Sequence, residues 1–580
     1  MTDYFEVLER DFGARLGKLR LDDGIVTPAV IPDDVLQDYG SLWTGEREQP
    51  EGDSSKVTIL PHRAMPSGTP KEVVQEKQPR HPETEFPSAA VVSHQEPAAD
   101  GHDVYILTGV EGGNSRDLVV AVVNARNRLE SDSLLLLPAS ATPRNVSLLA
   151  YLGVDGFDVD NAVVKGKGGV YMTDDLEIDV GELTELPCRC SVCSDSTPED
   201  ITREEVARHN VLALEAEVSR VRDKIRNGRL REYVETQVGR ARWMTEALRL
   251  LDHEYEDYVE SRTAVFRRSQ FDSNSMESLY RPDIRRFMDR VTERFSAPRN
   301  DCAVFLPCSA RKPYSESDSH EEFQSRIRGR AHEVVLTSPV GVVPRELELT
   351  YPASHYDTPV TGWWSPTEKE LVGEVLESYL EKNRYDRIVA HLPREGYGEI
   401  FESVCGKLDL EYEFTAGDLH PRDDDALGNL EEAVSEENQA NYDIQDKWIV
   451  KGVMDYQFGE GVFDEFFGLG GVRTEGRFPR LRFFDRDGQI GTLVPGYGSL
   501  ALTLYGAEKL PVAEVEIDDF VPSGSVLAPG VIDADEIRVG DEVYFEGPSA
   551  WGVGRAGMFG REMRESTRGI TVDVRHVEEK

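Results

Sequence analysis

The sequence predicts an α/β protein built from several domains. At 580 residues, the chain is too long to fold around a single hydrophobic core. Short apolar runs joined by polar connections are typical of buried parallel strands, and three occur in succession: DVYILTGV (103–110), LVVAVVNA (118–125) and SLLLLPAS (133–140). Apolar residues then recur at helical spacing from 198 to about 250, and strands with glycine turns dominate from 444 onward.

The first half is predicted to contain strands and then helices. Residues 14–32 have the pattern of short strands and a proline-bounded turn, and 44–102 carry scattered prolines and charges that indicate a loop-rich segment. Thr197, followed by Pro198 and several acids, predicts the N-cap of a long helix. A second helical stretch covers 279–295.

A new α/β unit is predicted from 302 to about 413. Its strands are expected within 302–307, 333–344 and 387–393, with helices over 366–382 and 396–406. Residues 416–440 are acidic and are expected to form a linker, and the strands of 444–580 divide into two small modules near 508.

The net charge is −43, from 108 acidic and 65 basic residues, of which 15 are Lys and 50 are Arg. An acidic excess with few lysines, in a chain that is still 39% hydrophobic, indicates a folded protein adapted to high intracellular salt, as in haloarchaea. The Debye length at molar ionic strength is about 3 Å. The acidic charge therefore does not argue against a nucleic-acid partner.

No stretch approaches the length of an apolar membrane span, and the start MTDYFEVLER lacks the pattern of a signal peptide. The protein is therefore expected to be cytoplasmic, without a membrane partner. In a reducing compartment, its six cysteines indicate metal binding or catalysis rather than disulfides.

Four residues have the pattern of a structural zinc site. PCRCSVC supplies Cys188, Cys190 and Cys193, and His209 follows on the predicted helix. Three thiolates and one imidazole fill all four positions of tetrahedral Zn²⁺, which leaves none open for catalysis. The alternative is three incidental thiols beside a surface histidine.

The same cysteine pattern, behind YLGVDGFDVDNA (151–162), resembles the tRNA-guanine transglycosylases. In that family a Gly-x-Asp-x-Phe-Asp segment carries the nucleophilic aspartate, which Asp158 matches by position. The family's second aspartate lies in an Asp-Ser-Gly-Gly-Phe-Gln motif, which has no counterpart here. The barrel portion, about 1–200, is also short for eight βα units. The resemblance thus implies a truncated transglycosylase-like (β/α) barrel in which Asp158 is structural or contacts the base, and base exchange is lost.

Residues 521–577 resemble a PUA domain, the β-pseudobarrel that grips RNA stems in modification enzymes. The resemblance is carried by Gly524-Ser525, the turn 528–531, the segments 540–543 and 552–555, and Arg568-Gly569. Guanidinium groups suit phosphate contacts, so RNA contacts are expected from Arg555, Arg561, Arg564 and Arg568. The alternative is solvated arginines paired with nearby glutamates. Residues 444–508 resemble the small α+β domain that precedes PUA in archaeal transglycosylases.

The stretch PCSARKPYSESDSH (307–320) follows a predicted strand and has the form Pro-Cys-x₃-Lys-Pro-Tyr-x₂-Ser-x₂-His. This form resembles the archaeosine synthase family, paralogues of the transglycosylases that convert the nitrile of 7-cyano-7-deazaguanine in tRNA to an amidine. The resemblance covers essentially the whole chain. It implies that the inserted α/β domain is catalytic, and that the catalytic residues are Cys308, Lys312, Tyr314, Ser317 and His320.

These residue types suit addition to a nitrile. Cys308 could add as thiolate to give a thioimidate, which an incoming amine displaces to leave an amidine. Lys312 and Arg311 would lower the pKa of the thiol, and His320 or Tyr314 could protonate the nitrogen. Alternatively the amine attacks directly and Cys308 is a pocket wall. Each residue also has a structural alternative: a small buried hydrophobe for Cys308, a phosphate contact for Lys312, a helix cap for His320.

A second polar cluster follows the strand at 333–344. Arg345 could bind a carboxylate, while Glu346 or Glu348 could bind an amino group, which would suit an amino-acid amine donor. A buried ion pair between Arg345 and a glutamate explains the same residues. The family resemblance implies lysine as donor, giving an adduct that a radical-SAM partner enzyme cleaves, or else glutamine or ammonia.

The sequence therefore predicts a tRNA-modifying transferase, expected as a homodimer, with structural zinc and no nucleotide cofactor, since it carries no Walker-type glycine loop. The rivals are an active transglycosylase and a non-catalytic tRNA-binding scaffold. The expected domains are 1–297 (transglycosylase-like), 298–415 (catalytic), 416–441 (acidic linker), 442–508 (pre-PUA) and 509–580 (PUA).

Overall fold

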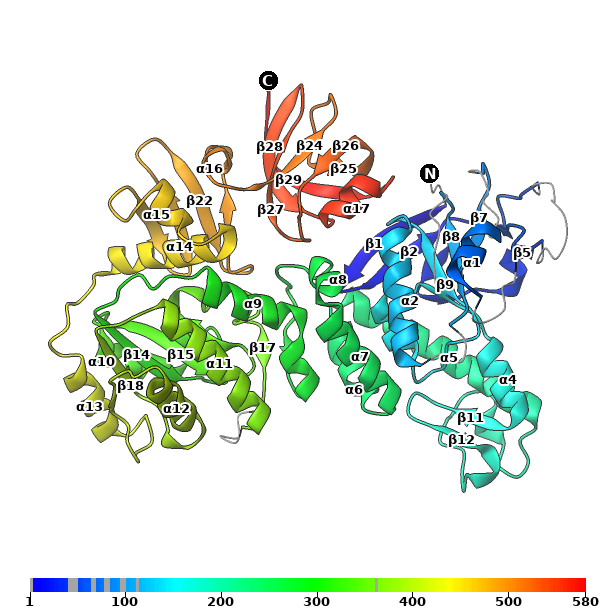
Figure 1. Cartoon of the computed structure of the whole chain (residues 1–580), viewed down its shortest axis with the longest axis horizontal. Helices are drawn as coiled ribbons and strands as arrows, with labels where there is room; N and C mark the ends of the chain where they lie inside the picture. Colours follow the sequence, from blue (N-terminus) through cyan, green and yellow to red (C-terminus); the bar gives the residue numbers. More distant parts are fainter. Residues whose placement is uncertain are drawn as a thin grey trace. The chain divides into compact units, whose positions relative to one another are not determined.

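The structure is a computed structural model that describes residues 4–39, 51–63, 69–77, 84–93, 101–110, 114–359 and 364–580. Figure 1 labels its helices and strands. The chain divides into two compact units. The first comprises Met1–Thr263, Ser525–Val539 and Gly557–Val572, and the second comprises Ala264–Gly524, Gly540–Ala556 and Asp573–Lys580.

A parallel sheet forms the core of the first unit. Its seven strands lie in the order β4-β10-β9-β8-β7-β6-β5, and every neighbouring pair is parallel. Because strands of this sheet are buried, β9 has the uninterrupted apolar sequence LLLL. Over the described residues this order is open and short of a closed eight-stranded ring, as the truncated barrel predicts. The strands are β4 Ala29–Val30, β5 Leu36–Asp38, β6 Val57–Ile59, β7 Ser88–Ser93, β8 Val104–Thr108, β9 Leu134–Leu137 and β10 Gly156–Phe157.

Smaller elements surround this sheet. Residues 14–32 form strands as predicted, and the antiparallel pairs β1–β2 and β2–β3 precede the parallel sheet. The N-terminal elements are β1 Phe5–Asp11, β2 Ala14–Leu19, β3 Ile25–Thr27, α1 Lys71–Lys77, α3 Val146–Leu152, α4 Asp160–Gly168, β11 Val170–Met172 and β12 Glu177–Asp179.

Several elements of this unit differ from the predictions. The run LVVAVVNA is not a strand but part of helix α2, Ser115–Arg128, which the side chain of Asn114 caps by accepting a hydrogen bond from the backbone N–H of Asp117. The helix is buried along much of its length, so its apolar run is continuous like that of a buried strand. Within the segment expected to be loop-rich, β6, β7 and α1 are regular structure; its residues 44–50, 64–68, 78–83 and 94–100 lie outside the described residues.

The predicted long helix is divided into several, and it starts later than expected. Thr202, not Thr197, is the N-cap, because Thr202 and Glu205 form a capping box. Thr197 instead closes a preceding turn, in which its hydroxyl donates to the Asp200 carboxylate over 2.9 Å. The helices are α5 Arg203–Arg226, α6 Leu230–Val238, α7 Arg242–Glu254 and α8 Glu256–Ser261.

The second unit contains the predicted α/β domain. Its sheet has the order β16-β15-β14-β18-β19, parallel except for the hairpin of β15 and β16. All strands and helices expected between 302 and 413 are present. The elements are β14 Cys302–Pro307, β15 His332–Thr337, β16 Gly341–Pro344, β18 Arg387–Ala390, β19 Glu413–Phe414, α9 Pro282–Glu293, α10 Asp318–Ile327, α11 Pro366–Lys382 and α12 Glu399–Lys407, with the short pair β13 Phe271–Asp272 and β17 Tyr356–Asp357.

The expected acidic linker contains a packed helix. Within 416–441, α13, Asp424–Ala433, buries Ala426, Leu427 and Leu430 at helical spacing and packs against α10. Its acidic residues belong to the solvent-exposed face, which made the segment resemble a linker. Helix α14, Tyr442–Phe458, follows directly and begins with Asn441 as N-cap.

The remaining chain forms two β-rich modules, as predicted. After α15, Val462–Phe466, an antiparallel sheet has the order β20-β21-β22-β23. A six-stranded sheet of order β25-β29-β28-β27-β24-β26 follows. The elements are β20 Arg473–Arg477, β21 Arg480–Phe484, β22 Gln489–Val494, β23 Ser499–Leu502, α16 Leu504–Lys509, β24 Ala513–Ile517, β25 Ser525–Leu527, β26 Val531–Ala534, β27 Glu542–Glu546, β28 Ala550–Ala556, α17 Gly560–Glu565 and β29 Ile570–Glu579.

Over the described ranges, no helix combines the length and the apolar character that crossing a membrane requires.

Candidate functional site

The candidate site lies where β14 and β18 end. After the central strand β14, the chain passes to β15 on one side of it and returns to β18 on the other. In open parallel sheets, ligands bind beyond the carboxyl ends of strands at such a switch point. A cavity of about 420 Å³ opens here, which is the size of a small-molecule site.

The cavity is lined by the residues that follow both strands and by the start of α11. Of the catalytic residues predicted from the sequence, Cys308 lies in this lining, as do residues that the sequence had not indicated. The lining includes Cys308, Ser338, Trp364, Glu368, Tyr397 and Arg422.

Cys308 makes a close contact with Tyr397. The Sγ atom lies 2.9 Å from the phenol oxygen, and either group can donate the hydrogen bond. Tyr397 is 8% exposed and packs against Trp364, with 4.6 Å between the ring centres. Burial and the adjacent thiol raise the pKa of Tyr397 far above its ordinary value. The phenol therefore keeps its proton at neutral pH.

The turn Arg394–Gly398 places Tyr397 beside Cys308. Gly396 has φ 75° and ψ −83°, a conformation that residues with a side chain rarely adopt. At Gly398, a Cβ atom would lie 3.0 Å from the carbonyl oxygen of Pro393. The sequence Gly-Tyr-Gly after a parallel strand adjacent to β14 was thus the signal that could have identified Tyr397.

The other residues of the 307–320 motif order the loop that carries Cys308. Ser317 is the N-cap of α10: its hydroxyl accepts from the backbone N–H of His320 and donates to the carbonyl oxygen of Tyr314. The Nε2–H of His320 donates to the carbonyl oxygen of Pro307 over 2.9 Å. The hydroxyl of Tyr314 pairs with that of Tyr356 at 2.7 Å. These contacts hold both ends of the loop.

Proton donation by Tyr314 or His320, which the sequence suggested, does not fit these contacts. Burial lowers the pKa of His320 to about 4, so its ring is neutral at neutral pH and its Nε2–H is already donated. The buried hydroxyl of Tyr314 is paired with that of Tyr356. Within the described part of the chain, neither residue belongs to the cavity lining.

Lys312 interacts electrostatically with Cys308 and lies over the ring of a second tyrosine. Its ammonium group is 3.9 Å from the ring centre of Tyr356. Burial lowers the pKa of Lys312, while its interactions with Cys308 and Asp357 oppose that shift. A cation held in this way would favour negative charge on the Cys308 sulfur.

The residues of the second predicted cluster, Arg345, Glu346 and Glu348, are paired with other side chains of the protein. Arg345 forms an ion pair with Glu348, and its guanidinium group lies over the ring of Phe478. Glu346 pairs with the Nε2 of His332 at 2.9 Å. None of the three residues belongs to the lining among the described residues. The arrangement matches the buried ion pair that the sequence left open, rather than a donor site.

Asp158 lies in the first unit, directly after β10. Its carboxylate accepts hydrogen bonds from the backbone N–H groups of Ala139 and Asp160, over 2.9 and 3.1 Å. Burial raises its pKa, and these hydrogen bonds oppose the rise. Asp158 thus joins the loops after β9 and β10.

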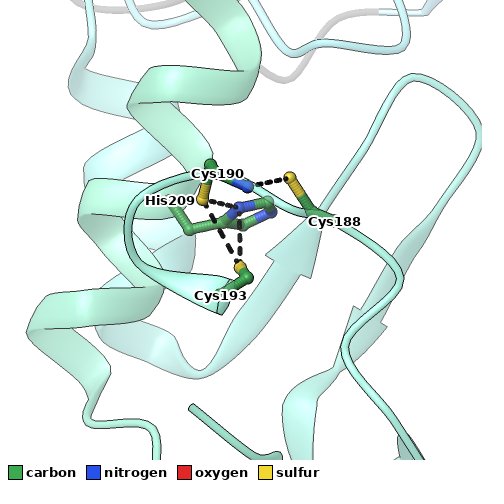
Figure 2. A group of neighbouring side chains, drawn as sticks. All are labelled: Cys188, Cys190, Cys193 and His209. Atoms are coloured by element: carbon green, nitrogen blue, oxygen red, sulfur yellow. Dashed lines mark hydrogen bonds between the residues drawn. The ribbon is translucent and has the colours of Figure 1, made fainter. Parts of the chain in front are cut away.

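The predicted metal-ligating residues come together in the first unit (Figure 2). The ligand atoms of Cys188, Cys190, Cys193 and His209 all lie within 4.8 Å of one another. The Nε2–H of His209 donates to the carbonyl oxygen of Met172 over 2.8 Å, so Nδ1 faces the sulfurs without a proton. The ring of Tyr171 stacks on the imidazole at 3.9 Å. The group has the geometry and the second-sphere contact to hold a metal ion.

The four C-terminal arginines have contacts within the protein. Arg561 donates to the backbone carbonyls of Arg126 and Leu129 and to Glu565. Arg564 donates to the carbonyl oxygen of Ala534. Arg555 lies over the ring of Tyr497 at 3.7 Å, and Arg568 is partly buried.

Four family models match the chain. Residues 88–242 match "Queuine tRNA-ribosyltransferase" and 449–513 match "Patch-forming domain C2 of tRNA-guanine transglycosylase". Residues 514–577 match "PUA domain". The α/β domain that contains Cys308 falls within 284–434, which match a domain of unknown function.

Curated relatives extend over the full length. The chain is 48% identical to "Archaeosine synthase" of Haloferax volcanii and 40% identical to "Archaeosine synthase subunit alpha" of Methanosarcina acetivorans, each over 100% of both chains. It is 27% identical to "tRNA-guanine(15) transglycosylase" of Methanobrevibacter smithii, over 76% of this chain and 66% of that protein.

Proposed function

This chain belongs to the archaeosine synthase family, and we propose that it adds an amine to the nitrile of 7-cyano-7-deazaguanine at position 15 of the tRNA D-loop, giving an amidine. Full-length similarity to archaeosine synthases supports the reaction class. The structural observation that carries the proposal is Cys308, at a ligand-sized cavity on the switch point of the α/β sheet.

In the proposed reaction, Cys308 is the nucleophile. Its sulfur bonds to the nitrile carbon, one π bond of C≡N becomes a lone pair on nitrogen, and that nitrogen takes a proton to give a thioimidate. The donor amine then bonds to the same carbon and the C–S bond breaks, which returns the thiol and leaves the amidine. The ammonium group of Lys312 stabilises the negative charge that develops on the sulfur as its proton leaves. The net reaction is an addition, so no atom is lost.

We propose lysine as the donor, with glutamine and ammonia as the competing donors in the test. Two oppositely charged side chains line the cavity, Glu368 and Arg422. They suit the ammonium and carboxylate groups of a free amino acid, in place of the predicted Arg345, Glu346 and Glu348, which lie outside the lining formed by the described residues. Arg422 would exchange its contact with Glu322 for the donor carboxylate. A lysine adduct would require a radical-SAM partner enzyme to cleave it to archaeosine.

The rest of the chain is proposed to hold the tRNA. The PUA domain would grip the RNA through Arg555, Arg561, Arg564 and Arg568, and Asp158 would contact or position the base. Cys188, Cys190, Cys193 and His209 would bind a Zn²⁺ ion with all four positions filled, so the ion would stabilise the fold and take no part in the reaction. A homodimer is proposed on the family resemblance.

The test is nucleoside mass spectrometry of tRNA that carries 7-cyano-7-deazaguanine, incubated in high salt with the purified protein and lysine, glutamine or ammonium separately. A mass gain of one lysine is expected. A gain of one ammonia would assign the complete amidine synthesis to this chain. No change with any donor, together with exchange of labelled guanine, would replace the proposal with a transglycosylase; no change in either assay would favour the tRNA-binding scaffold.

A further inference from the structure

We propose that Tyr397 is the proton relay of the nitrile addition, carrying protons between the Cys308 sulfur and the nitrile nitrogen. This inference rests on the proposed function and adds a catalytic residue to it. Its basis is the 2.9 Å contact between Sγ and the phenol oxygen at the wall of the cavity.

The position of the phenol follows from the chemistry of addition. In the forming thioimidate, sulfur and nitrogen are bonded to the same carbon, so a group in hydrogen-bond contact with the sulfur is also within reach of the nitrogen. As the S–C bond forms, the nitrogen takes the O–H proton of Tyr397 and the phenol oxygen takes the S–H proton of Cys308. Both protons are accounted for, and Tyr397 ends as a neutral phenol.

Burial explains why the two transfers must be coupled. Tyr397 is 8% exposed and packs against Trp364, and a phenolate in that position would be poorly solvated. An exchange in which the oxygen loses one proton while gaining another avoids that charge. In the second step the direction reverses: the donor nitrogen, now bonded to carbon, gives a proton to Tyr397, which gives its own to the departing sulfur.

The other polar side chains near Cys308 have different partners. The Glu368 carboxylate accepts from the hydroxyl of Ser338 and the backbone N–H of Ser365, each over 2.8 Å. Arg422 forms two hydrogen bonds with Glu322, at 2.8 and 2.6 Å. Tyr397 is the residue for which the described part of the structure records a side-chain hydrogen bond with the Cys308 sulfur.

The first test is Tyr397→Phe, which removes the hydroxyl and keeps the ring against Trp364. The rate constant for nitrile conversion is expected to fall about 100-fold or more, while the KM for tRNA stays within about twofold. Tyr379→Phe is the matched control, because Tyr379 is a buried tyrosine of α11 whose hydroxyl pairs with Tyr385 at 2.9 Å. Equal rate constants for wild type and Tyr397→Phe would overturn the relay.

A second measurement needs no nitrile. The rate of Cys308 alkylation by iodoacetamide at pH 7.5, followed by peptide mass spectrometry, reports the hydrogen bond to sulfur directly. In Tyr397→Phe this rate is expected to fall several-fold, because the reacting sulfur loses its hydrogen-bond donor. An unchanged rate would overturn the relay even if the wild type converts the nitrile. Failure of the wild type to convert it would instead reject the proposed function.

Discussion

The carboxylate of Glu348 accepts two hydrogen bonds from Ser315, one from the backbone N–H over 2.8 Å and one from the hydroxyl over 2.6 Å. This contact joins the polar segment after β16 to the loop that carries Cys308. Glu348 is 1% exposed and also pairs with Arg345. The two polar clusters seen in the sequence are thus parts of one support, and the second holds the first in place.

Replacing Glu348 should therefore lower the stability of the fold more than it weakens binding of the amine donor. Glu348→Ala removes one carboxylate partner of Arg345 and the acceptor of both Ser315 hydrogen bonds, and we expect the free energy of unfolding to fall by about 1.5–3 kcal/mol. Because the Cys308 loop loses its anchor, kcat should also fall, while the KM for the donor changes by less than about threefold. Urea unfolding and initial rates at varied lysine concentration measure these effects.

Glu348→Gln serves as the control for this prediction, because an amide oxygen can still accept from Ser315. It should lose less stability than the alanine variant. A large rise in the KM for lysine with unchanged stability would contradict the support role and return Glu348 to the donor site.

Substitution of Cys308 distinguishes covalent catalysis from direct attack of the donor amine on the nitrile. If the thioimidate forms, Cys308→Ala should lower the rate of nitrile conversion by at least about 1000-fold. Acid quenching of the wild type before donor addition should trap a tRNA nucleotide on the peptide that contains Cys308. Lys312→Ala should leave a smaller defect, about 10- to 100-fold, since it removes a nearby charge rather than the nucleophile. A nearly active Cys308→Ala would identify Cys308 as a wall of the cavity.

Much of the fold could be predicted from the sequence because its signals are local. The strand CAVFLP and the helix after Ser365 carry their own boundaries, a polar turn in the first case and a capping box in the second. Two of the wrong predictions fall in helices. In one, burial removes the hydrophobic periodicity of a helix, and in the other acidic residues obscure it. Helix α2 is buried on much of its surface, and α13 combines a buried apolar face with acids.

Only part of the candidate site could be predicted from the sequence, for a related reason. Cys308 lies in a continuous motif, but Tyr397 lies 89 residues away and comes close only because β14 and β18 are neighbouring parallel strands. The partners of Arg345 and Glu346 are likewise set by packing. The residue types indicated charged side chains near the site, but they could not show which of these charges are already paired with other side chains of the protein.

The Cys₃His cluster should be necessary for the fold around it. We expect about one equivalent of zinc per chain, and Cys193→Ser should lose it, because Cys193 is buried and lies 3.3 Å from Nδ1 of His209. Hydrogen exchange should then accelerate in β11, β12 and the start of α5, while the α/β domain stays protected. Cys405→Ser, at a buried cysteine outside the cluster, should keep the metal. Full zinc retention by Cys193→Ser would contradict this assignment.

His320 should make the second unit less stable in mild acid. Burial lowers its pKa to about 4 in the folded protein, against about 6.5 when unfolded. Between these values the unfolded chain binds the extra proton, so the free energy of unfolding falls as pH decreases through this window and levels off below about 4. At pH 5, His320 alone is expected to contribute about 2 kcal/mol to the loss relative to pH 8. His391, whose pKa burial also lowers to about 4, adds to the loss in the same window. Urea unfolding at both pH values, in the same high salt, measures this loss.

His320→Asn, although destabilised by loss of the contact with Pro307, should show a shallower pH dependence of the free energy of unfolding than the wild type. His576→Asn, at an exposed histidine, should keep the wild-type slope. An unaltered slope in His320→Asn would mean that another group controls the acid response.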